Sequence, residues 1–197
     1  MTVLFLVRHA VYEGYGPLLV GRARGYGLSV EGQRQAAALA ARLASERITG
    51  VVTSPRERAR ETAAPIAERC DVPLDVAAEL DEIDFGAWTG RSFANLHEEP
   101  LWQRWNTFRS GSRPPGGESM AEAQARALGR LDDLVVAEPD GRIVLVSHGD
   151  IIKALIAWFI GMPLDLMQRL EIAPASVSVL ELQPWGPRLL SLNEVVG

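Results

Sequence analysis

The sequence predicts an α/β fold with a mostly parallel central sheet. Three short apolar runs, at residues 3–7, 50–53 and 143–147, are rich in β-branched residues and nearly continuous rather than alternating. Such runs are typical of strands that are buried on both faces of a parallel sheet. Segments with the periodicity of helices lie between them, and this alternation of strand and helix favours helices layered on a sheet.

Two helices are predicted before residue 70. Residues 29–46 place apolar side chains at helical spacing, and Ser29 supplies the side-chain oxygen that often begins a helix. Residues 55–69 follow the second apolar run, and Pro55 suits the first turn of a helix. Both helices would therefore connect parallel strands.

Three more elements are predicted in the second half of the chain. A periodic helix covers residues 119–137, and a more apolar helix runs from Gly149 to about Gly161. Residues 176–182 and 188–192 flank a turn rich in proline and glycine, which indicates a terminal hairpin.

The chain shows no internal repeat and no interdomain linker, so residues 1–197 are expected to form a single domain. Residues 91–118 are rich in aromatic side chains and then in glycine and proline, which indicates a small cap inserted into the main layers. Leu101, Trp105 and Phe108 are spaced as one face of a helix, so packing explains these aromatics as well as ligand contact does.

Composition excludes several classes of function. Lys and Arg total 20 against 25 Asp and Glu, a formal charge of −5 with no basic block, so we expect no nucleic-acid partner. The single cysteine, Cys70, cannot form an internal disulfide or a cysteine-rich zinc site. The first ten residues are too few to span a bilayer and lack the basic start of a signal peptide, so we expect a cytoplasmic protein without membrane contact.

Two of the three histidines directly follow predicted strands. Arg8 and His9 come after the first strand, and His148 comes after the strand at 143–147. Ligands of open α/β sheets bind at the carboxyl ends of the strands. A lone histidine there is more often structural, but the shared placement favours a site, whereas His97 has no comparable context.

Two further segments carry charged side chains that could reach the same edge. Residues 54–62 bring Arg58 onto the first turns of a helix, although a solvated helix face explains Arg56 and Glu57. Residues 79–86 concentrate carboxyl groups among apolar residues, and one of these groups could be desolvated enough to hold a proton near neutral pH.

These pieces match the needs of phosphoryl transfer, which are a nucleophile, cations around the phosphoryl oxygens and an acid for the leaving oxygen. His9 would attack through an unprotonated ring nitrogen while an acceptor holds the other nitrogen. Arg8, Arg58 and His148 would balance the charge of the phosphate. The chain has no HExxH, paired CxxC or Walker-type motif, so we expect neither a metal nor a cofactor.

Five motifs, in order along the chain, resemble those of the histidine phosphatase superfamily, also called the phosphoglycerate mutase-like family. They are LVRHA at 6–10, SPxxRAxxTA at 54–63, the acidic stretch from 82 through Gly90, PGGES at 115–119 and VSHG at 146–149. Each is weak alone, but five in order are specific. The resemblance implies a three-layer α/β/α sandwich with a mostly parallel sheet.

The resemblance also implies a role for each matching residue. His9 would be the phosphorylated nucleophile, and Glu82, rather than Asp81 or Asp84, would be the proton donor. Arg8, Arg58 and His148 would form the phosphate pocket. Further substrate contacts would come from Arg60, Gly149 and Gly21.

The chain departs from the family pattern just after His9. Members commonly place an asparagine that binds phosphate a few residues on, where this chain has Tyr15. Either the hydroxyl of Tyr15 takes over that contact, or the loop at 11–17 follows a different path that Gly14 and Gly16 allow.

The first functional hypothesis is a phosphatase that hydrolyses a small phosphorylated metabolite through a phosphohistidine on His9. A cofactor-dependent phosphoglycerate-type mutase is an alternative, and a catalytically inactive regulator that binds a phosphorylated ligand is another. An exposed apolar face on the terminal hairpin would permit a homodimer. The sequence does not decide whether the leaving group of the substrate is acidic, a sugar or aromatic. Side chains that could contact such a group are those of Trp102, Trp105, Arg104, Arg109 and Arg113.

Overall fold

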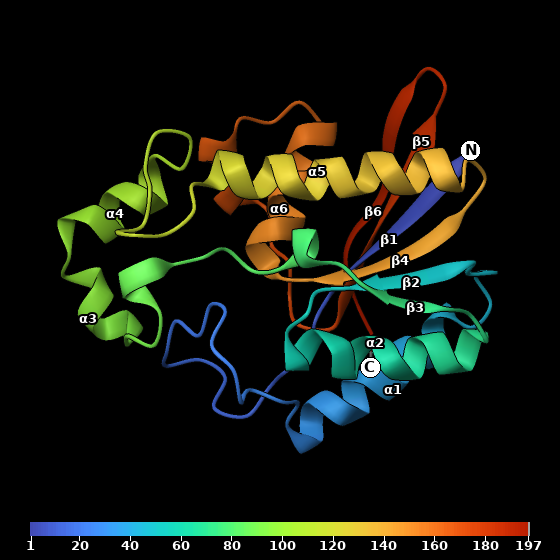
Figure 1. Cartoon of the computed structure of the whole chain (residues 1–197), viewed down its shortest axis with the longest axis horizontal. Coiled ribbons are helices and arrows are strands. Elements are labelled where there is room, and N and C mark those ends of the chain that lie inside the picture. Colours follow the sequence, from blue (N-terminus) through green and yellow to red (C-terminus); the bar gives the residue numbers. More distant parts are fainter. Residues whose placement is uncertain (197) are drawn as a thin grey trace.

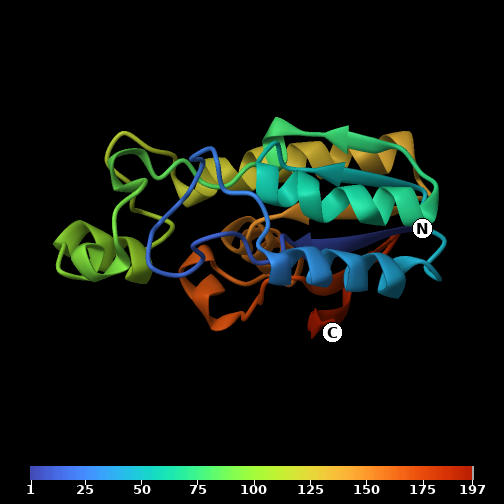
Figure 2. The same cartoon turned by 90° about the horizontal axis from the view of Figure 1, so that it is seen from below.

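The computed structural model describes residues 1–196 and contains one six-stranded sheet with helices on both faces (Figures 1 and 2). The strand order is β3-β2-β4-β1-β5-β6. The first four strands in this order run parallel, β5 runs antiparallel to β1, and β6 pairs antiparallel with β5. The three-layer α/β/α architecture with a mostly parallel sheet is therefore confirmed. The strands are β1 (Thr2–Arg8), β2 (Gly50–Thr53), β3 (Leu74–Val76), β4 (Arg142–Ser147), β5 (Ser176–Gln183) and β6 (Gly186–Val195).

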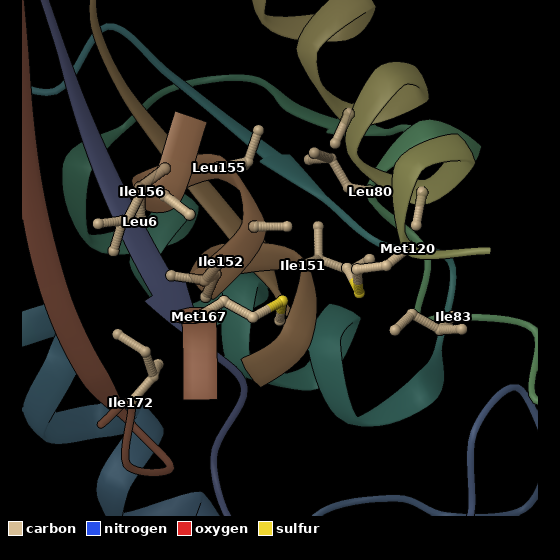
Figure 3. Close-up of a cluster of buried hydrophobic side chains, with 14 of the residues drawn as sticks. Leu6, Leu80, Ile83, Met120, Ile151, Ile152, Leu155, Ile156, Met167 and Ile172 are labelled. Atoms are coloured by element: carbon tan, nitrogen blue, oxygen red, sulfur yellow. The ribbon is translucent and has the colours of Figure 1, made fainter. Parts of the chain in front are cut away.

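Alternate side chains of β1 enter two separate apolar cores. Phe5 and Val7 belong to the core shared with α1 (Val30–Leu43) and α2 (Glu57–Cys70). Leu4 and Leu6 belong to the core on the other face, shared with the helices α5 (Met120–Ala137) and α6 (Gly149–Phe159). Figure 3 shows this second core, where Leu6 lies near apolar side chains of α6. Burial on both faces explains why the strand is continuously apolar.

Serine caps begin two of the predicted helices. The Ser29 side chain accepts a hydrogen bond from the Gly32 amide at the start of α1, as the sequence indicated. Ser119 and Glu122 form a reciprocal capping box at the start of α5. These caps set where each helix enters the layer.

The predicted start of the second helix is wrong by two residues. Helix α2 begins at Glu57, with Arg56 as the residue before its first turn, so Pro55 lies outside the helix. The hydroxyl of Ser54 accepts a hydrogen bond from the Arg56 amide, and this local turn keeps Pro55 out of the helix.

Four short elements have no counterpart in the sequence prediction. They are strand β3, whose three side chains are exposed at the sheet edge, and the short 3₁₀-helices η1 (Ala78–Leu80), η2 (Gly86–Trp88) and η3 (Leu164–Arg169). Gly86 has a positive φ, and a Cβ there would lie 2.2 Å from the Pro115 carbonyl oxygen. A glycine at this position therefore allows the acidic stretch to pack on the PGGES segment.

Residues 91–118 contain α3 (Phe93–His97) and α4 (Pro100–Thr107), which lie to one side of the layers in Figure 1. The predicted apolar stripe is wrong for Leu101 and Phe108, which are 55% and 41% exposed. Trp105, the third residue of the predicted stripe, is buried as expected. Trp102 is buried as well, and both tryptophans pack edge-on against Trp88. The role of this segment as a cap remains a prediction.

The terminal hairpin is present as β5 and β6. Strand β6 lies at the edge of the sheet opposite β3, and Leu190 and Leu192 are exposed on it. A homodimer through this face remains a prediction. None of the helices in residues 1–196 combines the length and the apolar character needed to cross a bilayer.

Candidate active site

A cavity of about 340 Å³ lies at the carboxyl end of β1, between the loop that follows this strand and the start of α6. Residues from every motif region except PGGES line it, and the VSHG region contributes only Gly149. Seven of the nine predicted site residues line the cavity: Arg8, His9, Tyr15, Gly21, Arg58, Glu82 and Gly149.

His9 has the protonation pattern of a nucleophile. Its ring is 3% exposed, and Nδ1 lies 2.8 Å from the carbonyl oxygen of Ala10. Because a carbonyl only accepts hydrogen bonds, the ring proton must be on Nδ1, which leaves a lone pair on Nε2. Burial, together with the nearby cations Arg58 and Arg8, holds the pKa of His9 well below its ordinary value. The ring is therefore neutral at neutral pH.

Arg58 bridges the two histidines of the site. Its Nε donates to His9 Nε2 at 3.2 Å, and its Nη2 lies 3.2 Å from His148 Nδ1. The same Nη2 donates to the Gly21 carbonyl oxygen at 2.8 Å, and the guanidinium lies over the Tyr12 ring, 5.3 Å from its centroid. These contacts hold a buried cation beside the lone pair of His9.

Arg8 is a second cation at the cavity. Its Nη1 donates to the Ile172 carbonyl oxygen at 2.5 Å, and its Nη2 donates to the Tyr15 hydroxyl at 3.2 Å. Tyr15 thus lies where its hydroxyl could meet a group bound by Arg8. Gly149 begins α6 beside this guanidinium, since a Cβ on it would be 3.3 Å from Arg8 Nε. The amide groups at a helix N-terminus favour a bound anion.

His148 lies behind the cavity rather than in its wall. The ring is completely buried, and its centroid is 5.2 Å from that of His9. Its Nδ1 accepts from Arg58, so Nε2 carries the proton and donates to Ser54 Oγ at 2.8 Å. Ser54 in turn donates to the Asp81 carboxylate at 3.3 Å. In this geometry His148 reaches the cavity through Arg58, and its role in holding phosphate remains a prediction.

Glu82 is the acidic residue of its stretch that reaches the cavity. Burial raises the pKa of Glu82 to about 7, and the charge of Asp150 adds to this, while Arg58 opposes it. Asp81 instead pairs with Arg56 at 2.9 Å, and Asp84 accepts from the Gly86 amide. Neither of these carboxyl groups lines the cavity.

Arginines hold the backbone of the acidic stretch in place. Arg22 Nε and Arg126 Nη2 donate to the Glu82 carbonyl oxygen at 2.6 and 3.2 Å. Glu118, from the PGGES segment, pairs with both arginines at 2.9 and 2.7 Å. Sequence reasoning missed Arg22, Arg126 and Ser54, because their role depends on contacts between distant segments.

Several candidates lie away from the cavity. Arg60 is exposed on α2 and is not part of the cavity wall, so it is left out of the site proposed below. Arg56 and Glu57 were expected to lie on a solvated helix face, and this expectation is wrong. Arg56 pairs with Asp81, and the Glu57 carboxylate accepts hydrogen bonds from the amides of Gly25 and Tyr26.

Five residues were candidates for contact with the leaving group of the substrate. Trp102 and Arg109 line the cavity, whereas Trp105, Arg104 and Arg113 do not. Arg113 pairs instead with Glu122. Within residues 1–196, no group of three His, Cys, Asp or Glu side chains lies close enough to hold a metal ion.

Solved structures with the same fold include several phosphatases. A mycobacterial glucosyl-3-phosphoglycerate phosphatase is 28% identical, with a TM-score of 0.88, and each chain is covered to 98%. A mutant phosphoserine phosphatase from Entamoeba histolytica, in complex with phosphoserine, is 26% identical, with a TM-score of 0.89. That likeness covers 99% of this chain and 98% of the other.

The curated relatives include proteins that are not named as phosphatases. A probable phosphoglycerate mutase from Yersinia enterocolitica is 31% identical over 189 residues, which are 94% of this chain and 88% of that protein. A bifunctional protein from Mycobacterium tuberculosis is 33% identical over 199 residues, and this chain spans about half of its length. The family model of the histidine phosphatase superfamily (branch 1) matches residues 4–195. The chain therefore belongs to the histidine phosphatase superfamily.

Proposed function

We propose that the protein is a phosphatase that hydrolyses a small phosphomonoester through a phosphohistidine on His9. The observation that carries this proposal is the state of the His9 ring. Its Nε2 lone pair shares a cavity with the guanidinium groups of Arg8 and Arg58 and with the Glu82 carboxyl group, whose pKa is raised to about 7. Nucleophile, charge stabilisation and proton donor are thus all within one cavity.

In the first step the phosphoryl group of the substrate is bound by Arg8, Arg58 and the Gly149 amide. Arg58 Nε, which donates to His9 Nε2 before substrate binds, turns to the phosphoryl oxygens and frees the Nε2 lone pair. Nε2 then attacks phosphorus, the N–P bond forms and the P–O bond to the alcohol breaks. Glu82 gives its proton to the departing oxygen. The ring gains positive charge as the N–P bond forms, and the Ala10 carbonyl that accepts from Nδ1 stabilises this charge.

In the second step Glu82, now a carboxylate, removes a proton from a water molecule. The water oxygen attacks phosphorus, the N–P bond breaks and inorganic phosphate leaves. This step restores the neutral His9 ring and the protonated Glu82. The bound dianion would raise the pKa of His148, which would then add a positive charge behind Arg58.

The second candidate function is that of a mutase, which returns the phosphoryl group from His9 to a reoriented substrate. The Yersinia relative, which is named a probable phosphoglycerate mutase, favours this candidate. The two reactions share the first step and differ in whether water or the substrate receives the phosphoryl group. Supplying 3-phosphoglycerate with and without bisphosphoglycerate separates them, since a mutase forms the isomer and a phosphatase releases inorganic phosphate.

Turnover of an aryl phosphate tests the assignment of the nucleophile. His9→Ala should abolish phosphate release, and His97→Ala, which removes an exposed histidine on α3, should retain it. Equal rates for the wild type and His9→Ala would refute the proposal. A folded, fully stable wild type without hydrolysis of any phosphomonoester would support an inactive regulator instead.

A further inference from the structure

The single lysine of the chain lines the cavity. The other 19 of the 20 Lys and Arg residues are arginines, and Lys153 lies in the cavity wall on α6. Its Nζ donates to Gln168 Oε1 at 3.0 Å, and Gln168 also lines the cavity. Within residues 1–196 this amide is the one hydrogen-bond partner of Nζ, so two of its three hydrogens remain for a bound group.

The nearby carboxylate is already paired with another cation. Asp150 precedes Lys153 by three residues on α6, but its Oδ2 lies 2.8 Å from Nη1 of Arg109. Arg109 is 3% exposed and also donates to the Asn106 side chain. Burial lowers the pKa of Lys153, and Asp150 and Glu171 partly oppose this. An anion bound at Lys153 would relieve the cost of burying its charge.

The charges of the cavity leave one cation without a function in the proposed reaction. Arg8 and Arg58 lie beside His9 and match a phosphate dianion, and Asp150 balances Arg109. Glu82 acts in its protonated form in the first step. The remaining positive charge in the cavity wall is that of Lys153.

The spacing along α6 places this charge close to the phosphoryl group. Gly149 and Lys153 are four residues apart, so they share one face of the helix at a rise of about 6 Å. Gly149, Lys153 and the Gln168 side chain that accepts from Nζ all line the same cavity. A substrate that touches both must therefore be short.

We infer that Lys153 determines specificity by binding a carboxylate of the substrate's alcohol portion, a few bonds from the phosphoester oxygen. The preferred substrate is then a small phosphorylated hydroxy acid rather than a neutral sugar or aryl phosphate. This inference rests on the proposed function. It assigns to Lys153 a contact with the substrate and no part in bond making.

Kinetics with a matched pair of substrates tests the inference. 3-Phosphoglycerate and glycerol 3-phosphate differ in a carboxylate against a hydroxymethyl group. For the wild type, kcat/KM should favour the acid at least tenfold, Lys153→Gln should lose that preference, and Lys153→Arg should retain part of it. Arg169→Gln, which removes an exposed cation next to Gln168, should leave the ratio unchanged.

A binding measurement separates this inference from the proposed reaction. Reductive methylation with ¹³C-formaldehyde labels Lys153 and the N-terminal amine, and Lys153→Arg assigns the two signals. In the His9→Ala protein, 3-phosphoglycerate should shift the Lys153 signal and glycerol 3-phosphate should shift it far less. If the wild type showed no turnover, the proposed phosphatase reaction would be refuted. The inference about Lys153 would still be tested, because the shift of its signal requires no catalysis.

Three results would overturn the inference. One is an equal substrate preference in the wild type and in Lys153→Gln. Another is an equal loss of kcat/KM for both substrates in Lys153→Gln, which would indicate a structural role. The third is a Lys153 signal that moves equally, or not at all, with the two ligands.

Discussion

Replacing Glu82 with glutamine should stabilise the protein, and the gain should depend on pH. Burial makes the charged carboxylate costly in the folded protein, which is why its pKa rises from 4.5 to about 7. Glutamine has nearly the same shape and never ionises. The substitution therefore removes a penalty that the wild type meets at every pH where the carboxyl of the unfolded chain is ionised.

The pKa gives the size and sign of this effect. A group whose pKa is raised on folding binds its proton more tightly in the native state, so its stabilising contribution is complete below 4.5 and is lost as pH rises through about 7. With these two values, the penalty in the wild type is about 1 kcal/mol at pH 5 and about 3 kcal/mol at pH 8. Glu82→Gln should gain these amounts, or about 6–12 °C in melting temperature at pH 8.

Urea denaturation of the wild type and the variant between pH 5 and pH 8 measures this difference. Glu79→Gln is the matched control, because that side chain is exposed on η1 three residues earlier. Its difference from the wild type should stay near zero throughout. A Glu82→Gln protein that is no more stable than the wild type at pH 8, or equally more stable at both pH values, would contradict a buried, proton-holding carboxyl.

The kinetics of Glu82→Gln and of two other substitutions test the site. Glu82→Gln should lower turnover of alkyl phosphates by about 10²–10⁴ and of aryl phosphates with good leaving groups far less, because the latter need little proton donation; a uniform loss would argue against an acid. Arg58→Ala should lower kcat by about 10²–10³ in steady-state assays, and Arg60→Ala by less than twofold. An unchanged kcat with a lowered melting temperature would give Arg58 a structural role instead. Gly149→Ala should raise KM about tenfold by pressing a Cβ against Arg8, and an unchanged KM would exclude that contact.

Much of the fold followed from local patterns. The continuous apolar runs predicted the three central strands correctly, because burial on both faces leaves no polar alternation. Strand β3 was not predicted, because its three side chains are exposed. It is a strand because its backbone pairs with that of β2. The start of α2 depends on a hydrogen bond from the Arg56 amide to Ser54, which no helical periodicity reveals.

The site was predictable where residues follow strands and less so elsewhere. Arg8, His9 and Gly149 meet at one sheet edge because β1 and β4 are parallel neighbours. Composition alone did not choose among the carboxyl groups of residues 79–86. The structure distinguishes Glu82 by the cavity, and this depends on Arg22 and Arg126 from distant segments.

Trapping the phosphorylated enzyme tests the central claim most directly. The protein is mixed with a phosphomonoester, quenched in alkali within milliseconds and digested, and the peptides are examined by mass spectrometry. We predict a base-stable, acid-labile phosphate on the peptide that contains His9, present in His97→Ala and absent in His9→Ala. Rapid turnover with no phosphate on that peptide at any quench time, or with phosphate on another residue, would contradict the account.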